Sequence, residues 1–323
     1  MTGGTNQWQL DRELFSDAAV SPATRELNQK VAAAAALRPH RTELTVEQER
    51  ALPPGGGVIP IATNSARAST IEAAFGNAPA VPVRVVPPQG QSRGVYVHFH
   101  GGGWAFGSAA NHDDVLERIA DTAGVTCLSI DYRLAPDHVF PAPVQDGQTV
   151  LSWLLHGTAS VEHHDRVILG GESAGAHLAC LTALWLRDRG GHGVLRGLNL
   201  SQGMYDLRLT PGARLYGRGS HVIDTPTLVQ MTTRFLADAD AASPQVSPLL
   251  ADLRDLPPAL FTVGTLDPLL EDSLFMYARW VAAGNAAELK IAPGAIHGYT
   301  FMDYPQGREA ATRIERFVAS CAS

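Results

Sequence analysis

Lysine is almost absent from this chain of 323 residues, in which Lys30 and Lys290 are the only two. The chain has no polybasic run, and its formal net charge at pH 7 is -7. Such a charge offers little electrostatic attraction to nucleic acid or to an anionic lipid surface. We therefore expect no nucleic-acid partner, and the shortage of lysine also argues against Schiff-base chemistry.

Cysteine is scarce as well, because Cys127, Cys180 and Cys321 are an odd number of thiols with no C-x-x-C spacing. This pattern predicts neither a disulfide framework nor a zinc site, so we expect buried free thiols. Residues 1–17 are polar and acidic and lack the apolar segment of a secretory signal. The longest plain apolar run, 31–37, is far shorter than a membrane span. We expect a cytoplasmic protein without a membrane span.

Short apolar runs alternate with amphipathic helical patterns from about residue 69 onward. Near-continuous apolar strands separated by helices are typical of a mostly parallel sheet with both faces covered. The expected strands are 82–86, 94–99, 125–131, 166–170, 197–201, 259–263 and 288–291. The expected helices between them include 113–123, 146–155 and 270–283.

Two segments lie outside this alternation. Near the start, a helix is predicted over 23–37 and a second short helix over 45–51, before a loop at 53–60 that is rich in proline and glycine. Farther on, residues 206–242 interrupt the alternation as an insertion, with a helix expected over 225–236.

The sequence G-E-S-A-G at 171–175 stands between a predicted strand and a predicted helix. In this context G-x-S-x-G is the nucleophile elbow, a strained turn that exposes a serine at the start of a helix. Gly171 and Gly175 are needed because side chains there would collide with neighbouring backbone. We expect Ser173 to be a nucleophile, and a plain helix start is the alternative.

A serine hydroxyl is a poor nucleophile unless a base takes its proton. In folds with this elbow the acid and then the histidine follow the serine along the chain. Asp267 follows the predicted strand 259–263, and His297 follows the last strand, so both stand at carboxyl ends of strands, where sites of open α/β sheets lie. Singly, Asp267 could be a turn residue and His297 a surface residue. Their order and positions together predict a triad with Ser173.

Three consecutive glycines, 101–103, follow another predicted strand. When a serine attacks a carbonyl, the oxygen becomes an anion that peptide N–H groups must meet at about 3 Å. A loop that presents consecutive N–H groups to a ligand cannot carry side chains in the way. The expected oxyanion hole consists of the N–H groups of Gly102, Gly103 and Ala174.

Histidines precede these glycines at alternate positions. His98 and His100 lie on one face of the predicted strand, and such an H-x-H pair can bind a metal ion. No third ligand is evident, so we expect no metal, and we expect His100 to brace the glycine loop rather than act as a base. His177, on the helix after Ser173, is expected to be a packing residue.

Short motifs in a characteristic order extend over nearly the whole chain. They are H-G-G-G-W at 100–104, D-Y-R-L-A-P-D at 131–137, F-P-A at 140–142, G-E-S-A-G at 171–175, S-P-L at 247–249, L-P-P at 256–258, D-P-L at 267–269 and P-G-A-I-H-G-Y at 293–299. On these motifs the chain resembles the hormone-sensitive-lipase-like family of α/β-hydrolase carboxylesterases, which are mostly bacterial. The resemblance implies an α/β-hydrolase fold with a mostly parallel central sheet, helices on both faces and a helical cap.

The resemblance also implies an organisation of the chain. Residues 1–55 would be N-terminal cap helices, and 56–323 a catalytic domain with a cap insertion at about 206–242. The resemblance implies that homodimers are frequent. From the serine mechanism itself, we expect no metal or organic cofactor. This chain departs from the family at Glu172, where Asp is usual, and at Tyr299, where Phe is common. We expect a hydrogen-bonding role for Glu172 and a Tyr299 hydroxyl near the site entrance.

Further residues are expected to support or line the site. Asp131 and Arg133 of the D-Y-R run are expected in buried pairing. The residues expected to line the substrate pocket, with core packing as the alternative, are Trp104, Phe106, Tyr205 and Tyr299.

These features predict a serine carboxylesterase that hydrolyses short- to medium-chain esters, its small-molecule substrates, through an acyl-enzyme. An arylformamidase or amidase could use the same triad. A ligand receptor is a second alternative, since plant gibberellin receptors resemble the family but have lost the catalytic histidine, and His297 is present here. Transfer of the acyl group to an alcohol, in place of water, is a third alternative.

Overall fold

A computed structural model describes residues 10–52, 64–157, 161–219 and 221–323. Within these ranges, eight strands form one sheet in the order β1-β2-β4-β3-β5-β6-β7-β8. The strands are β1 Ser69–Ala73, β2 Val81–Val86, β3 Val95–Phe99, β4 Thr126–Ile130, β5 Val167–Glu172, β6 Leu195–Ser201, β7 Ala259–Gly264 and β8 Ala287–Ala292. β2 pairs antiparallel with both β1 and β4, and the remaining pairs are parallel. The predicted mostly parallel sheet is confirmed.

Each strand that the sequence predicted is present, with ends within two residues of the predicted ones. The sequence did not predict β1, the antiparallel edge strand. Its residues, S-T-I-E-A, form no apolar run, and only Ala73 is buried. An edge strand with one solvated face carries too little hydrophobic signal to be recognised.

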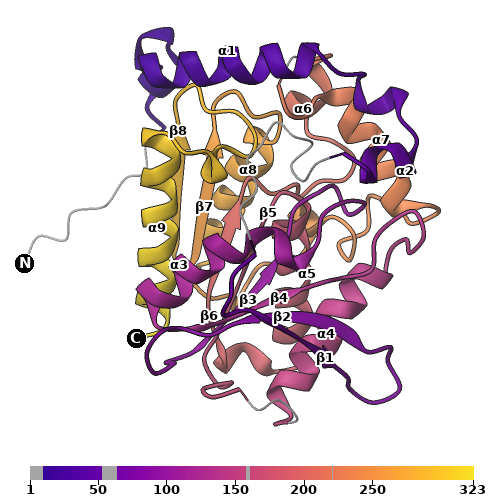
Figure 1. Ribbon diagram of the computed structural model, residues 1–323, viewed down its shortest axis with the longest axis vertical. Coiled ribbons are helices and arrows are strands. Elements are labelled where there is room, and N and C mark those ends of the chain that lie inside the picture. The colour runs from indigo at the N-terminus through magenta and orange to yellow at the C-terminus, as the bar shows by residue number, and fades with distance from the viewer. Residues whose placement is uncertain (1–9, 53–63, 158–160, 220) are drawn as a thin grey trace, which may run out of the picture.

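Helices cover both faces of the sheet (Figure 1). On one face, α3 (Asp113–Ala123) and α9 (Pro305–Cys321) enclose a core with the strands. On the other face, α4 (Ala142–Leu155), α5 (Ala174–Arg187) and α8 (Leu270–Ala282) enclose a larger core. Every residue of β3 and of β4 is buried, as expected for strands that are covered on both sides.

The helices of the N-terminal segment lie beside those of the 206–242 insertion, at the top of Figure 1. They are α1 Pro22–Ala36, α2 Val46–Arg50, α6 Pro211–Leu215 and α7 Thr225–Leu236. Polar contacts join the two segments. His40 is hydrogen-bonded to Asp224 at 2.8 Å, and ion pairs join Glu43 with Arg218 at 2.8 Å and Glu49 with Arg234 at 2.5 Å. The bounds of these helices confirm the ones predicted at 23–37, 45–51 and 225–236. The loop predicted at 53–60 lies outside the described residues.

No helix in the described ranges is long and apolar enough to cross a membrane. The thiols of Cys127, Cys180 and Cys321 are free, as expected from their spacing. Cys127 and Cys180 are buried, and Cys321 is half-buried.

The prediction that Asp131 and Arg133 pair is wrong. The guanidinium of Arg133 lies 2.7 Å from Oδ1 of Asp146 on α4. The other carboxylate oxygen of Asp146, Oδ2, accepts the backbone N–H of Arg133 at 2.8 Å. Asp131 is exposed and accepts the N–H of Ala109 at 3.0 Å. Because Asp146 is buried, its carboxylate needs a cation more than the exposed Asp131 does.

We expect Asp146→Asn to lower the free energy of unfolding by about 3 kcal/mol, because it breaks a largely buried ion pair. Urea unfolding monitored by fluorescence measures this change. The control is Asp137→Asn, which removes an ion pair whose carboxylate side chain is 61% exposed, and whose loss should change stability by less than about 1 kcal/mol. Equal effects of the two substitutions would contradict the assignment of Asp146 as a structural anchor.

Candidate active site

Ser173 lies in the turn between β5 and α5. Its φ of 56° is a left-handed conformation that is strained for a residue with a side chain. Its N–H donates to the carbonyl of Ser201 at 2.9 Å. On either side, Gly171 and Gly175 lie so close to the carbonyl of Phe99 that a Cβ at either position would overlap it. The turn therefore has the strained geometry of a nucleophile elbow.

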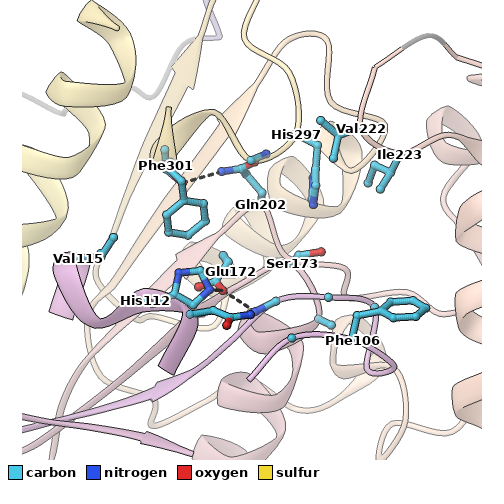
Figure 2. A pocket seen from close by; sticks show the side chains of 18 of the residues that line it. Phe106, His112, Val115, Glu172, Ser173, Gln202, Val222, Ile223, His297 and Phe301 are labelled. Carbon is cyan, nitrogen blue, oxygen red and sulfur yellow. Dashed lines mark hydrogen bonds and ion pairs between the residues drawn. The ribbon is translucent and has the colours of Figure 1, made fainter. Parts of the chain in front are cut away.

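His297 and Asp267 lie together at the same end of the sheet. Nδ1 of His297 is 2.9 Å from Oδ2 of Asp267, whose other oxygen accepts the N–H of Leu269 at 2.8 Å. Asp267 is buried, whereas His297 and Ser173 both line one cavity. Figure 2 shows the His297 ring pointing toward Ser173 across this cavity. Three residues from separate motifs thus meet beyond the ends of β5, β7 and β8.

The glycine loop after β3 lines the same cavity. Gly102 has a φ of 121° and Gly103 a φ of 58°, which is the left-handed region that favours glycine. A Cβ at Gly102 would overlap the carbonyl of Phe106, and one at Gly103 would overlap the side chain of Met231. In the described part of the chain, neither glycine N–H donates to a protein acceptor. These N–H groups, with that of Ala174, are available to a ligand.

Glu172, the last residue of β5, holds the glycine loop in place. Its Oε1 accepts the N–H of Gly101 and lies 3.1 Å from Nε2 of His112, and its Oε2 lies 3.0 Å from Nε2 of His98. Burial by itself raises the pKa of Glu172, but the charges of and hydrogen bonds from His112 and His98 outweigh it and hold the pKa well below its usual range. The same pairing raises the pKa of His112 against the effect of burial.

His100 contacts the glycine loop and helps to hold its shape. Its Nδ1 lies 2.8 Å from the carbonyl oxygen of Gly101, and its ring stacks on Tyr132 with 4.2 Å between centroids. The Tyr132 hydroxyl donates to the carbonyl of His100 at 2.7 Å. Burial lowers the pKa of His100 to about 4. Because this buried, stacked imidazole does not line the cavity, it fits a brace and not a base.

Both ring nitrogens of His98 have hydrogen-bond partners in the protein. Its Nδ1 lies 2.9 Å from the hydroxyl of Ser129, and its Nε2 contacts Glu172. In the residues that the structure describes, no group of three or more His, Cys, Asp or Glu side chains is placed to hold a metal ion.

The cavity has a volume of about 1010 Å³, and Trp104 and Phe106 are among its lining residues. Tyr205 and Tyr299 are not, and for them the prediction is wrong. Tyr205 is fully buried and packs edge-to-face on Phe261, with 6.3 Å between centroids. Tyr299 is 1% exposed and turns away from the cavity into an apolar cluster. Both aromatic rings serve the core, so the hydroxyl of Tyr299 does not lie at the site entrance.

Several lining residues were not predicted. Gln202, His112 and Phe301 lie on the cavity wall (Figure 2), and apolar residues of the insertion line the same cavity. Those apolar residues are Val222, Ile223, Leu228 and Met231. No motif or spacing distinguishes them in the sequence, because they come from separate segments that only the fold brings together: the turn after β6, the segment between β3 and α3, the insertion and the last loop.

The strained serine turn, the strand-end His–Asp pair and the mostly parallel sheet define an α/β hydrolase. A family model described as the alpha/beta hydrolase fold matches residues 96–301. The chain belongs to this family, and its resemblance to the hormone-sensitive-lipase-like carboxylesterases is confirmed.

Esterases are among the relatives and solved structures to which the chain is similar. An acetyl esterase of Salmonella choleraesuis (strain SC-B67) is 31% identical over 225 residues, which are 68% of this chain and 69% of that protein. A hyperthermophilic esterase of the archaeon Pyrobaculum calidifontis has a TM-score of 0.82 at 30% identity, with 94% of this chain and 99% of that chain covered. A thermostable carboxylesterase cloned from a metagenomic library has a TM-score of 0.75 at 25% identity, with 95% and 100% covered.

The Glu172–His112 pair predicts a specific pH dependence of stability. Because the pKa of Glu172 is lowered on folding, its charge stabilises the fold above its ordinary pKa of 4.5, and this contribution is lost as the pH falls. Because the pKa of His112 is raised, its charge stabilises the fold below its ordinary pKa of 6.5, and this contribution is lost as the pH rises through the raised value. The pair is therefore most stabilising between these two values.

We expect Glu172→Gln to reduce the free energy of unfolding most near pH 5.5, by about 3 kcal/mol, and less toward pH 8. Urea unfolding at several pH values measures the difference from the unsubstituted protein. Glu288→Gln, which removes a carboxylate that is 65% exposed, controls for the loss of one charge. A Glu172→Gln effect that does not vary with pH would show that the carboxylate is not paired with a charged imidazole.

Proposed function

We propose that the protein is a serine carboxylesterase that hydrolyses short- to medium-chain carboxylic esters. The observation that carries this proposal is that Ser173, His297 and the loop of Gly102 and Gly103 line one cavity, with Asp267 bonded behind His297. The relatives described above are named as esterases, which favours esters over the amides and formamides that the same groups can hydrolyse.

In the proposed acylation step, the Ser173 hydroxyl attacks the ester carbonyl carbon while Nε2 of His297 takes its proton. The carboxylate of Asp267 accepts from Nδ1–H of His297 and so leaves Nε2 unprotonated and able to act as the base. The carbonyl oxygen becomes an oxyanion, which the N–H groups of Gly102, Gly103 and Ala174 stabilise. His297 then gives its proton to the departing alcohol, and the acyl group remains on Ser173.

In the proposed deacylation step, water takes the place of the alcohol. His297 removes a proton from the water as the water attacks the acyl carbonyl, and the same N–H groups stabilise the second oxyanion. The acyl–oxygen bond to Ser173 breaks, the serine oxygen receives the proton from His297, and the carboxylic acid leaves. Every proton in this cycle is moved by His297, so the reaction needs no cofactor.

The walls of the cavity favour small apolar esters. Phe106, Ile223 and Met231 present apolar surface near Ser173, and the cavity volume of about 1010 Å³ is sufficient for an acyl and an alcohol group of modest size. Such a volume is at the upper end of the range of about 300–1,000 Å³ that is usual for small-molecule sites. The apolar lining favours apolar acyl and alcohol groups, and the series of acyl chain lengths below tests their size.

Residues 1–55 and the 206–242 insertion act, in this proposal, as a cap on the catalytic domain. The cap contributes to the cavity wall from both segments, with Arg50 and Leu52 from the first and Leu228 and Met231 from the second. Side-chain contacts of the cap therefore set the shape of the substrate pocket. The polar groups that carry out the chemistry come from the catalytic domain.

Initial rates on p-nitrophenyl esters from acetate to long acyl chains test the proposed function. We expect the highest kcat/KM at short to medium chains, and we expect Ser173→Ala to lower it by at least about 10⁴-fold while the protein remains folded. Circular dichroism and urea unfolding monitor the fold of the variant. Ester turnover retained by Ser173→Ala would place the nucleophile elsewhere, and turnover of aryl formamides but not esters would identify the alternative hydrolase.

Substitution of Gly103 tests the proposed oxyanion hole. We expect Gly103→Ala to lower kcat by about 10²-fold to 10³-fold, since its Cβ would overlap Met231 and its backbone would leave the left-handed region, which removes a donor to the oxyanion. Gly76→Ala is the matched control, because Gly76 has a φ of 60° and no atom within 4 Å of an added Cβ. Loss of stability without loss of kcat is expected in the control. An unchanged kcat in Gly103→Ala would remove this loop from the mechanism.

A further inference from the structure

Gln202 lines the same cavity as Ser173 and His297, but it has no role in the proposed mechanism. It follows β6, is 1% exposed and has a φ of 51°, so the fold holds a residue with a side chain in the left-handed region. Its N–H donates to the carbonyl of Thr262 on β7 at 2.8 Å. The carbonyl of Ser201, the residue before it, accepts the N–H of Ser173 at 2.9 Å. The backbone of Ser201 and Gln202 therefore links β7 to the serine turn.

The side chain of Gln202 ties a third segment to the same point. Its Oε1 accepts the N–H of Gly298, and its Nε2 donates to Oγ1 of Thr300 at 3.1 Å. Gly298 directly follows His297 and is itself in the left-handed region, with a φ of 80°. Figure 2 shows the Gln202 side chain beside His297 on the cavity wall. A dashed line marks its hydrogen bond to the segment that follows His297. Both bonds thus act on the loop that carries the proposed base.

We propose that Gln202 is a positioning residue, whose amide fixes the His297 loop relative to the Ser173 turn. Both partners of the amide are buried, so without it the Gly298 N–H would have no acceptor and the loop would shift to regain one. A shift of about 1 Å in a catalytic group can lower a rate by about 100-fold. This inference rests on the proposed function, in which His297 must reach the Ser173 hydroxyl.

The choice of substitution separates positioning from packing. Gln202→Met has nearly the same length and volume but can neither accept from Gly298 nor donate to Thr300. Gln202→Glu keeps an acceptor for the Gly298 N–H, and the Thr300 hydroxyl can rotate to donate to its second oxygen. Thr300→Val removes one of the two bonds and leaves the other. Gln145→Met is the control, since Gln145 is exposed on α4 and its amide has no hydrogen bond in the described structure.

The experiment measures kcat and KM on p-nitrophenyl butyrate at a pH where the reaction is fastest, with the concentration of active sites titrated for each variant. We expect Gln202→Met to lower kcat by about 10-fold to 100-fold with KM changed by less than about threefold. We expect Gln202→Glu to recover most of kcat, Thr300→Val to lose about threefold to tenfold, and Gln145→Met to match the unsubstituted protein. Rescue by glutamate and not by methionine is a result that a purely packing role would not give.

The proposal is overturned if Gln202→Met keeps kcat per titrated active site within about twofold of the unsubstituted protein, or if Gln202→Glu is as impaired as Gln202→Met. If Gln202→Met does not fold, Thr300→Val decides, and an unchanged kcat in it overturns the proposal. Ser173→Ala measured in parallel separates the two levels of inference. Activity retained in Ser173→Ala rejects the proposed triad, whereas an inactive Ser173→Ala beside a fully active Gln202→Met rejects only the positioning role.

Discussion

The close approach of two glycine-rich turns is the constraint on which the rest of the site depends. β3 and β5 are parallel neighbours, so the turns that follow them leave the sheet about 4.8 Å apart. Gly171 and Gly175 let the carbonyl of Phe99 lie against the start of α5. A side chain at either glycine would separate the turns and move the N–H groups of the glycine loop away from Ser173. The relative position of the proposed nucleophile and the proposed oxyanion donors is therefore set by the pairing of β3 with β5.

The surroundings of the histidines near the site decide which of them can act as the base. Burial lowers the pKa of His100 and of His177 to about 4. His177 uses both ring nitrogens in structural hydrogen bonds, and His100 uses its Nδ1. His112 lines the cavity and has a carboxylate partner, but Glu172 raises its pKa and thereby favours the charged form, which cannot accept a proton. His297 differs from these three because it combines a carboxylate on Nδ1 with a place on the cavity wall facing Ser173.

The sequence was sufficient where chemistry or burial leaves a local pattern. Apolar runs identify the buried strands, and the G-x-S-x-G turn can be recognised without a structure because few sequences satisfy its steric demands. Side-chain direction has no such pattern, which is why Tyr205 and Tyr299 were expected in the pocket but lie in the core. Partners far apart in the chain are also hidden from sequence reasoning. Gln202 and Thr300 are separated by 98 positions, and only the sheet brings them together.

Glu172 and Gln202 have parallel roles on either side of Ser173. Glu172, directly before the serine, accepts the N–H of Gly101 and so fixes the loop of the proposed oxyanion donors. Gln202 follows the residue that accepts the serine N–H, and it accepts the N–H of Gly298 beside the proposed base. In both cases a buried side-chain oxygen captures a loop N–H, so a shift of either loop would leave that N–H without an acceptor. The strained serine turn is thereby the common reference for the proposed oxyanion donors and for the proposed base, and the proposed triad keeps its geometry although its members stand on three separate loops.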